Sequence, residues 1–350
     1  MRLRCIPIIL LLTACGSEAD PTATNESASG GSSSGGNAAA GQPGSGGGGA
    51  IGSAGWTAGG STGSGGSVAG AAGQGASAGA AGAAGGAGAP PQDPNAPLPY
   101  PNKAVAIYHM MWSNSGSPQL SALPANANVV NLAFAQGDPP QLVGWASQSK
   151  QSFVADAEAP RKKGVNIVIS IGGAGGNVNV SHRQAFVDGI MAINSEVTLD
   201  GLDWDLEGPA LVKDDVVWIS KELKAKRGQN FSITMAPNGS NVDEYIPVAV
   251  ALHQAGALDM IGQQFYDAVV SYGAALGRVN QMANAGIPDD RIGIGMMVGS
   301  ADTYWTVSEC KEAVNFIKGP HAGVRGGYLW EHGRSGTQEW ADQVGALLLK

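Results

Sequence analysis

The sequence contains few cysteines, and their scarcity excludes several ways of stabilising a domain. The 350 residues include three of them, Cys5, Cys15 and Cys310. The first two lie in an N-terminal targeting segment, so Cys310 is the one cysteine left for a folded domain. We therefore expect no intramolecular disulfide and no thiolate metal site. The five histidines show no metal-ligand spacing either, so we expect neither a metal nor a cofactor.

Charge is nearly absent between Pro21 and Pro90, where Glu26 is the only charged residue and Gly, Ala and Ser predominate. Such a stretch has too little apolar surface to offset the entropy of ordering it, which predicts a flexible tether. The alternative, a repetitive structural protein, requires a strict period, whereas Gly occurs here irregularly. The net charge of −8 and the scattered Lys and Arg residues argue against a nucleic-acid partner.

The sequence also lacks an apolar run long enough to span a bilayer. The longest candidate, Ile6–Leu12, is short, follows Arg2 and Arg4, and leads into Leu12-Thr-Ala-Cys15. This pattern resembles a bacterial lipobox, in which the cysteine is acylated; an ordinary secretory signal peptide is the alternative. We predict a lipoprotein signal peptide over residues 1–15, a tether over 16–96 and one folded domain over 97–350. The domain is expected outside the cytoplasm. It would be either anchored through Cys15 to a bacterial membrane, at the outer membrane or cell surface, or secreted.

Short apolar segments rich in β-branched residues recur along the folded part, each followed by a turn and a segment with helical spacing. Strands that alternate with helices pair in parallel, and eight such units in about 250 residues predict a closed (β/α)₈ barrel without an inserted α+β subdomain. An open doubly wound sheet is the alternative. The expected strands are 103–110, 128–135, 165–171, 202–207, 231–236, 260–266, 291–298 and 326–330.

Acidic residues alternate in the fourth expected strand, Asp200-Gly-Leu-Asp-Trp-Asp-Leu-Glu207. Asp203, Asp205 and Glu207 share one face of a strand, so in a barrel they would climb the interior with Glu207 uppermost, at the end where barrel active sites lie. Closely spaced buried carboxyls cannot all ionise, so one or two would stay protonated. The same alternation also fits an edge strand that exposes its carboxylates, and spacing alone does not decide between the two.

The run at 200–207 resembles the D-x-x-D-x-D-x-E signature of family 18 of the glycoside hydrolases. Further segments match that family's compact, hevamine-like chitinases in the same order along the chain: Ile107-Tyr108, Asn131–Phe134, Ser170-Ile-Gly-Gly173, Gln264-Phe-Tyr266 and Gly326–Trp330. The resemblance covers the folded part from about Ala104 to Trp330 and argues against the edge-strand alternative.

The resemblance implies retaining hydrolysis beside a 2-acetamido sugar, with the acetamido oxygen of the substrate as the nucleophile. Glu207 would be the catalytic acid and then the base. Asp205 would orient the acetamido N–H, Asp203 would hold Asp205 from below, and Tyr266 would position the acetamido carbonyl. The other site residues that it implies fall into two groups, with Trp330, Tyr108, Phe134, Met235 and Gln264 lining the sugar site and Ser170, Gly172, Gly173 and Asp200 supporting it.

The implied function is that of an endo-acting chitinase on chitin or an oligosaccharide that contains N-acetylglucosamine, and we expect a monomer. Two alternatives remain open. One is an endo-β-N-acetylglucosaminidase that acts on N-glycan cores. The other is a surface protein that binds carbohydrate without cleaving it, although such proteins typically lack the acid that Glu207 provides here.

Overall fold

The computed structural model covers the chain and describes residues 93–207, 211–266, 271–299 and 304–350. The predicted signal peptide, the lipidation site Cys15 and the predicted tether up to residue 92 lie outside the described residues. Within the described ranges, no helix is both long enough and apolar enough to cross a bilayer.

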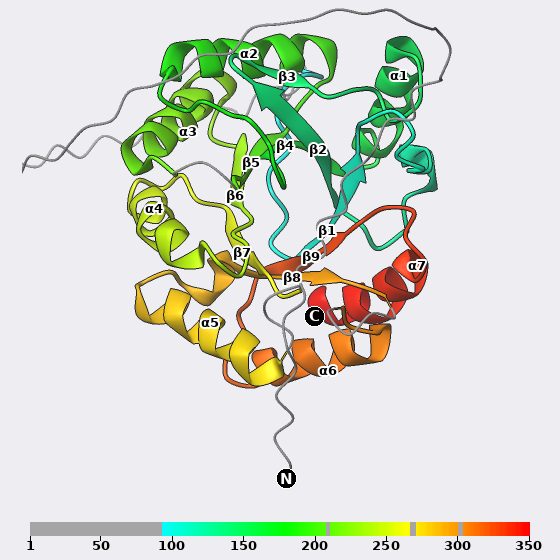
Figure 1. Cartoon of the computed structure of the whole chain (residues 1–350). Helices are drawn as coiled ribbons and strands as arrows, with labels where there is room; N and C mark the ends of the chain where they lie inside the picture. The colour runs from blue at the N-terminus through cyan, green and yellow to red at the C-terminus, as the bar shows by residue number, and fades with distance from the viewer. Residues whose placement is uncertain (1–92, 208–210, 267–270, 300–303) are drawn as a thin grey trace, which may run out of the picture. The chain divides into compact units, whose positions relative to one another are not determined.

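Eight parallel strands close into a barrel, which confirms the predicted (β/α)₈ architecture (Figure 1). Each strand pairs with the next one around the barrel, and β9 returns to β1 with Ala104 opposite Gly326. A short antiparallel strand, β3 (Pro140–Leu142), extends β2 and was not predicted. The barrel strands are β1 (Ala104–Met110), β2 (Val129–Gly137), β4 (Asn166–Gly172), β5 (Gly201–Asp205), β6 (Ser232–Met235), β7 (Met260–Gln264), β8 (Ile292–Met297) and β9 (Gly326–Trp330).

Helices surround the barrel and cover its outer face (Figure 1). Several begin at side chains that accept hydrogen bonds from backbone N–H groups of the first turn. Thr306 and Glu309 form a capping box, and Ser149 and Ser271 cap two other helices. The helices are α1 (Lys150–Arg161), α2 (Arg183–Glu196), α3 (Lys213–Arg227), α4 (Val242–Gln254), α5 (Tyr272–Asn284), α6 (Val307–Lys318), α7 (Thr337–Trp340) and α8 (Ala346–Leu348), with short turns η1 (Leu120–Ala122), η2 (Asp289–Arg291) and η3 (Ala341–Gly345).

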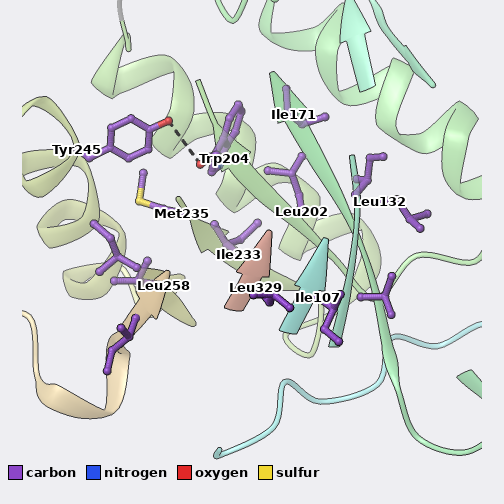
Figure 2. Packing of buried hydrophobic residues seen from close by; sticks show 14 of the residues in the cluster. Ile107, Leu132, Ile171, Leu202, Trp204, Ile233, Met235, Tyr245, Leu258 and Leu329 are labelled. Carbon is purple, nitrogen blue, oxygen red and sulfur yellow. Dashed lines mark hydrogen bonds between the residues drawn. The ribbon is translucent and has the colours of Figure 1, made fainter. Parts of the chain in front are cut away.

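The alternation of side chains along each strand divides the core into two layers. One set points outward and packs against the helices, as Ile107, Leu202 and Ile233 do in Figure 2. The other set fills the barrel interior and includes Tyr108 and Tyr328. Full burial of one large apolar side chain stabilises a fold by about 2 kcal/mol, so the outer layer is the main source of stability for a domain without a disulfide.

Two of the predicted strand ends differ from the structure in a way that matters for the site. β5 ends at Asp205 and β7 ends at Gln264, so Glu207 and Tyr266 lie beyond the sheet. Both positions are at the C-terminal end of the barrel, where the strands stop pairing and the loops begin. The backbone there is not held by strand neighbours, and other contacts fix its conformation.

Asp200 lies at the opposite end of the barrel, so its predicted role in supporting the sugar site is wrong. Its carboxylate forms an ion pair with Arg161 (3.0 Å) and accepts hydrogen bonds from the backbone N–H groups of Leu98 (2.8 Å) and Ile167 (2.9 Å). Asp200 precedes β5, whereas the site lies where β5 ends. It therefore fixes the entry segment: Arg161 also donates to the carbonyls of Pro94 and Ala96, just before the predicted start of the domain.

Candidate active site

Asp203 is the deepest of the three predicted carboxylates, and it is surrounded by donors from three other strands. Tyr108 on β1 (2.7 Å) and Ser170 on β4 (2.8 Å) donate to Oδ2, and Thr234 on β6 (2.6 Å) donates to Oδ1. Its exposed fraction is 2%, which excludes an exposed edge strand. Burial raises the pKa of Asp203, and the three hydrogen bonds act in the opposite direction.

Asp205 lies two residues further along β5, on the same face, and is equally buried. Burial raises the pKa of Asp205 well above its usual range, and the nearby carboxyls of Glu207 and Asp203 raise it further. Gln264 donates through Nε2 to Asp205 (3.0 Å) and to Glu207 (3.3 Å), so one amide nitrogen bridges the two carboxyls. Two carboxyls held this close do not both ionise easily, which favours one shared proton.

A pocket of about 420 Å³ opens over this pair, a volume typical of small-ligand sites. Glu207 is half-buried in it, while Tyr266 is 8% exposed. Among the described residues of the lining, Asp205 and Glu207 are the carboxylates. The lining brings together ends of most barrel strands and consists of Trp112, Phe134, Gln136, Val143, Ala174, Asp205, Glu207, Gln264, Tyr266, Met297 and Trp330.

Aromatic rings form one side of the pocket. Trp330, at the end of β9, lies nearly parallel to Phe134 with the ring centroids 5.6 Å apart, and Phe134 lies nearly parallel to Trp112 at 6.4 Å. Sugar rings present apolar C–H faces, and such faces pack on aromatic rings. The structure thus brings Trp330 and Phe134 together as predicted, and it adds Trp112.

The turn after β4 requires glycine for two separate reasons. Gly172 and Gly173 both have positive φ angles, +111° and +77°. In addition, a Cβ on Gly172 would lie 2.3 Å from the carbonyl oxygen of Asp205, and a Cβ on Gly173 would lie 2.4 Å from the Phe134 ring. These glycines let the turn approach both Asp205 and Phe134 closely.

Two predicted lining residues do not reach the pocket. Tyr108 is 1% exposed and lies below Trp330, with the ring centroids 5.5 Å apart, so it supports Asp203 instead of contacting a ligand. Met235 has the opposite strand parity from Thr234 and packs in the outer layer near Ile233 and Tyr245 (Figure 2). Its prediction as a lining residue was wrong because alternate residues of a strand face opposite sides.

Thr234 was missed, although the alternation in 231–236 could have placed it inside the barrel. Met297, at the end of β8, could have been found by the same alternation, and Gln136 lies in β2 beyond the predicted end of that strand. Val143 and Ala174 were missed because they lie in loops, where periodicity gives no signal. Within the described ranges, no group of His, Cys, Asp and Glu is arranged to hold a metal ion.

The raised pKa of Asp205 predicts how protein stability depends on pH. Between about pH 4 and its folded pKa, the folded protein holds a proton that the unfolded chain releases, so rising pH favours unfolding by about 1.4 kcal/mol per pH unit. Asp205→Asn removes this dependence. We expect the free energy of unfolding of the variant, minus that of the unaltered protein, to grow as the pH rises from 4 toward neutrality.

Urea unfolding of both proteins at several pH values would measure this difference. Asp188→Asn, at an exposed position on α2, provides a control that should leave the pH dependence unchanged. A difference between the Asp205 variant and the unaltered protein that is independent of pH would contradict the prediction.

Comparison with known families agrees with the site. The model of the family described as "Glycosyl hydrolases family 18" matches residues 104–314. Chitinase ChiA of Flavobacterium johnsoniae is 28% identical over 218 residues, which make up 49% of this chain and 14% of that protein. Exochitinase 1 of Streptomyces olivaceoviridis is 31% identical over 175 residues, 41% of this chain and 29% of that protein. The chain therefore matches less than a third of the length of either relative.

Solved structures agree with the fold. A candidate chitinase A from Streptomyces coelicolor superposes with a TM-score of 0.63 at 21% identity, covering 71% of this chain and 99% of that one. At this identity the likeness supports the barrel architecture, while the chemistry rests on the residues of the pocket.

Proposed function

Because this chain belongs to glycosyl hydrolase family 18, we propose that it is a chitinase-type glycosidase that cleaves β-1,4 linkages between N-acetylglucosamine units. The observation that carries the proposal is the pair of carboxyls Asp205 and Glu207, both contacted by Gln264 Nε2, in a pocket lined by Trp330. A proton available next to an aromatic surface suits the departure of a sugar leaving group.

We propose that the substrate supplies its own nucleophile. Glycosidases that use two carboxylates place them on opposite faces of the sugar, about 5 to 9.5 Å apart. Here both carboxylates of the described lining accept from the same Gln264 nitrogen, so they lie close together on the same side. That arrangement supports attack by the acetamido carbonyl oxygen of the bound sugar instead.

In the first step, the Glu207 proton passes to the glycosidic oxygen, and the bond from C1 to that oxygen breaks. The acetamido oxygen forms a bond to C1, which gives a cyclic oxazolinium ion. Water then attacks C1 and reopens the ring, while the Glu207 carboxylate accepts the proton of that water.

Asp205 would orient the acetamido N–H and stabilise the positive charge of the intermediate. Charge stabilisation of this kind is strong where water is excluded, and Asp205 is 2% exposed. Asp203 lies deeper than Asp205 in the buried column and does not line the pocket. Its three hydrogen-bond donors fix its position. Tyr266 in the lining would position the acetamido carbonyl.

The polymer and the mode of action can be tested by product analysis. We expect oligosaccharides of mixed lengths from chitin early in the reaction, which is the result of endo cleavage, and no release from a high-mannose glycoprotein. Release from the glycoprotein alone would instead indicate an endo-β-N-acetylglucosaminidase. A single small product from the beginning would indicate exo action.

Attachment to a bacterial membrane through Cys15 belongs to the same proposal. It is supported by the lipobox-like run Leu12-Thr-Ala-Cys15 and by the length of the Gly- and Ala-rich segment after it. Such a tether would let the catalytic domain reach an insoluble polymer near the cell. Mass spectrometry of the mature N-terminus should find acyl chains on Cys15, and a mature protein without them would refute the anchor.

A further inference from the structure

The backbone N–H and carbonyl of Leu206 belong to the two peptide bonds that join Asp205 to Glu207, and they lie at a point where the sheet no longer supports the chain. The pairing of β5 with β4 ends at Asp205, opposite Gly172, and the pairing with β6 ends at Trp204, opposite Met235. One more hydrogen bond on each side, from Gly173 to Asp205 and from Ala236 to Trp204, completes these ladders. The backbone that carries Glu207 therefore depends on contacts from outside the sheet.

Helix α4 provides these contacts from behind the strand. The Tyr245 hydroxyl accepts a hydrogen bond from the Leu206 N–H at 2.6 Å, and Asn241 donates through Nδ2 to the Leu206 carbonyl at 2.8 Å. The Tyr245 hydroxyl can in turn donate to the Leu206 carbonyl at 3.3 Å or to the Trp204 carbonyl at 3.4 Å. Figure 2 shows Tyr245 and Trp204 side by side. The N–H and the carbonyl of Leu206 are thus both held, by Tyr245 of α4 and by Asn241 at the N-terminus of that helix.

Both side chains are themselves fixed. Tyr245 is fully buried in the outer layer, and burial raises its pKa well above the usual range, so its hydroxyl keeps its proton. Asn241 Oδ1 accepts from the Asn238 N–H (2.9 Å), and Asn238 Oδ1 accepts from the Asn241 N–H (3.1 Å). This turn joins the end of β6 to the start of α4, so the contacts to Leu206 are part of a rigid corner.

We propose that Tyr245 and Asn241 are positioning residues for the catalytic acid, and that they aim the Glu207 carboxyl at the glycosidic oxygen by holding the Leu206 peptide. The proposal rests on the assignment of Glu207 as the acid. Neither side chain lines the pocket, so neither contacts the substrate. Their effect should therefore be confined to the steps in which Glu207 transfers a proton, and the first of these delivers the proton to the leaving group.

A comparison of kcat/KM for substrates with different leaving groups isolates proton delivery to the leaving group. An alkoxide leaving group, as in the tetramer of N-acetylglucosamine, needs a proton from the acid, whereas the 4-methylumbelliferyl group of an aryl chitobioside departs with little protonation. The ratio kcat/KM reports on events up to the first cleavage. A misplaced acid therefore lowers kcat/KM for the tetramer far more than for the aryl glycoside.

The experiment measures kcat/KM of Tyr245→Phe on both substrates. We expect a loss of about 10- to 100-fold on the tetramer, the scale of a misplaced catalytic group, and of about threefold or less on the aryl glycoside. Asn241→Ala should show the same difference between substrates with a smaller loss. Because the Asn241 side chain is partly exposed, this variant carries the test if Tyr245→Phe does not fold in a thermal unfolding measurement.

Ser220→Ala is the matched control. It removes a buried hydrogen bond of the same outer layer, from the Trp204 indole to Ser220 on α3, without touching the Leu206 peptide. Ser220→Ala should change kcat/KM for both substrates by the same small factor. Equal losses on the two substrates in Tyr245→Phe, or no loss on either, would overturn the inference while leaving the proposed function intact. Failure of the unaltered protein to hydrolyse either substrate would overturn both.

Discussion

Replacing Glu207 by glutamine is expected to lower turnover of the N-acetylglucosamine tetramer by about 10³-fold or more, since a general acid and base contributes about 10²- to 10⁴-fold and Glu207 serves in both steps. Glutamine has the same shape, and its side-chain oxygen can still accept the hydrogen bond that Gln264 donates to Glu207. We therefore expect binding of the tetramer to remain within a few-fold of the unaltered protein. Steady-state kinetics and titration calorimetry would measure the two quantities separately.

A surface variant controls for the loss of one carboxylate. Glu222 forms an ion pair with Lys226 on α3, and Glu222→Gln should leave turnover unchanged. If Glu207→Gln kept turnover within about tenfold of the unaltered protein, Glu207 could not be the acid. If the variant lost binding as well, the substitution would have disturbed the pocket itself. The loss of turnover would then not distinguish a glycosidase from the alternative of a non-catalytic carbohydrate-binding protein.

The second large effect concerns the substrate. A fully deacetylated tetramer, with a free amine at every C2, should be cleaved at least about 10³-fold more slowly than the acetylated tetramer at saturating concentration. The amine has no carbonyl oxygen to attack C1, and well-oriented internal nucleophiles are worth effective concentrations of about 10⁵ M or more. Among the described lining residues, the two carboxylates lie together on one side of the pocket and offer no replacement.

The comparison uses turnover numbers at saturating substrate, so weaker binding of the deacetylated tetramer does not affect it. A stable thiazoline analogue of the oxazolinium ion provides a second measurement, because it should inhibit as a mimic of the intermediate. Comparable turnover of the two tetramers would refute substrate assistance and would require a nucleophile from the protein.

Glu207 and Asp205 act as a pair in this scheme, and the structure gives a physical reason. Asp205 is too deeply buried to ionise easily, and its contact with Glu207 raises its pKa further. The raised pKa of Asp205 lets this carboxyl keep a proton to higher pH than an isolated carboxyl would. The three donors around Asp203 partly offset the raised pKa of that residue and keep the base of the column in place.

Much of the fold could be predicted because it depends on local patterns. Short β-rich segments alternate with helical segments eight times, and this order alone favours a closed parallel barrel. The alternation Asp203, Asp205 predicts two carboxylates on one face of β5, and the structure places both inside the barrel. Strand parity, applied consistently, would also have found Thr234 and excluded Met235.

Other features depend on residues that are far apart in the chain. Tyr108 and Asp203 are 95 residues apart, and their hydrogen bond exists because closure of the barrel sets β1 and β5 at the same height across its interior. Local patterns hold no information on that height, so Tyr108 was expected in the pocket and lies beneath it. The prediction for Asp200 failed for the same reason, because its neighbours Leu98 and Arg161 come from segments that only folding brings to it.

Glu207 combines both kinds of information. The sequence by itself determined which carboxylate is the outermost of the column, because Glu207 follows Asp203 and Asp205 along a chain that runs toward the C-terminal end of the barrel. Only the tertiary structure decided that β5 stops two residues earlier and that Tyr245 and Asn241 of α4 hold the peptide before the acid. The reason is that side-chain direction follows from neighbouring residues, whereas the position of a loop depends on whichever distant groups satisfy its backbone hydrogen bonds.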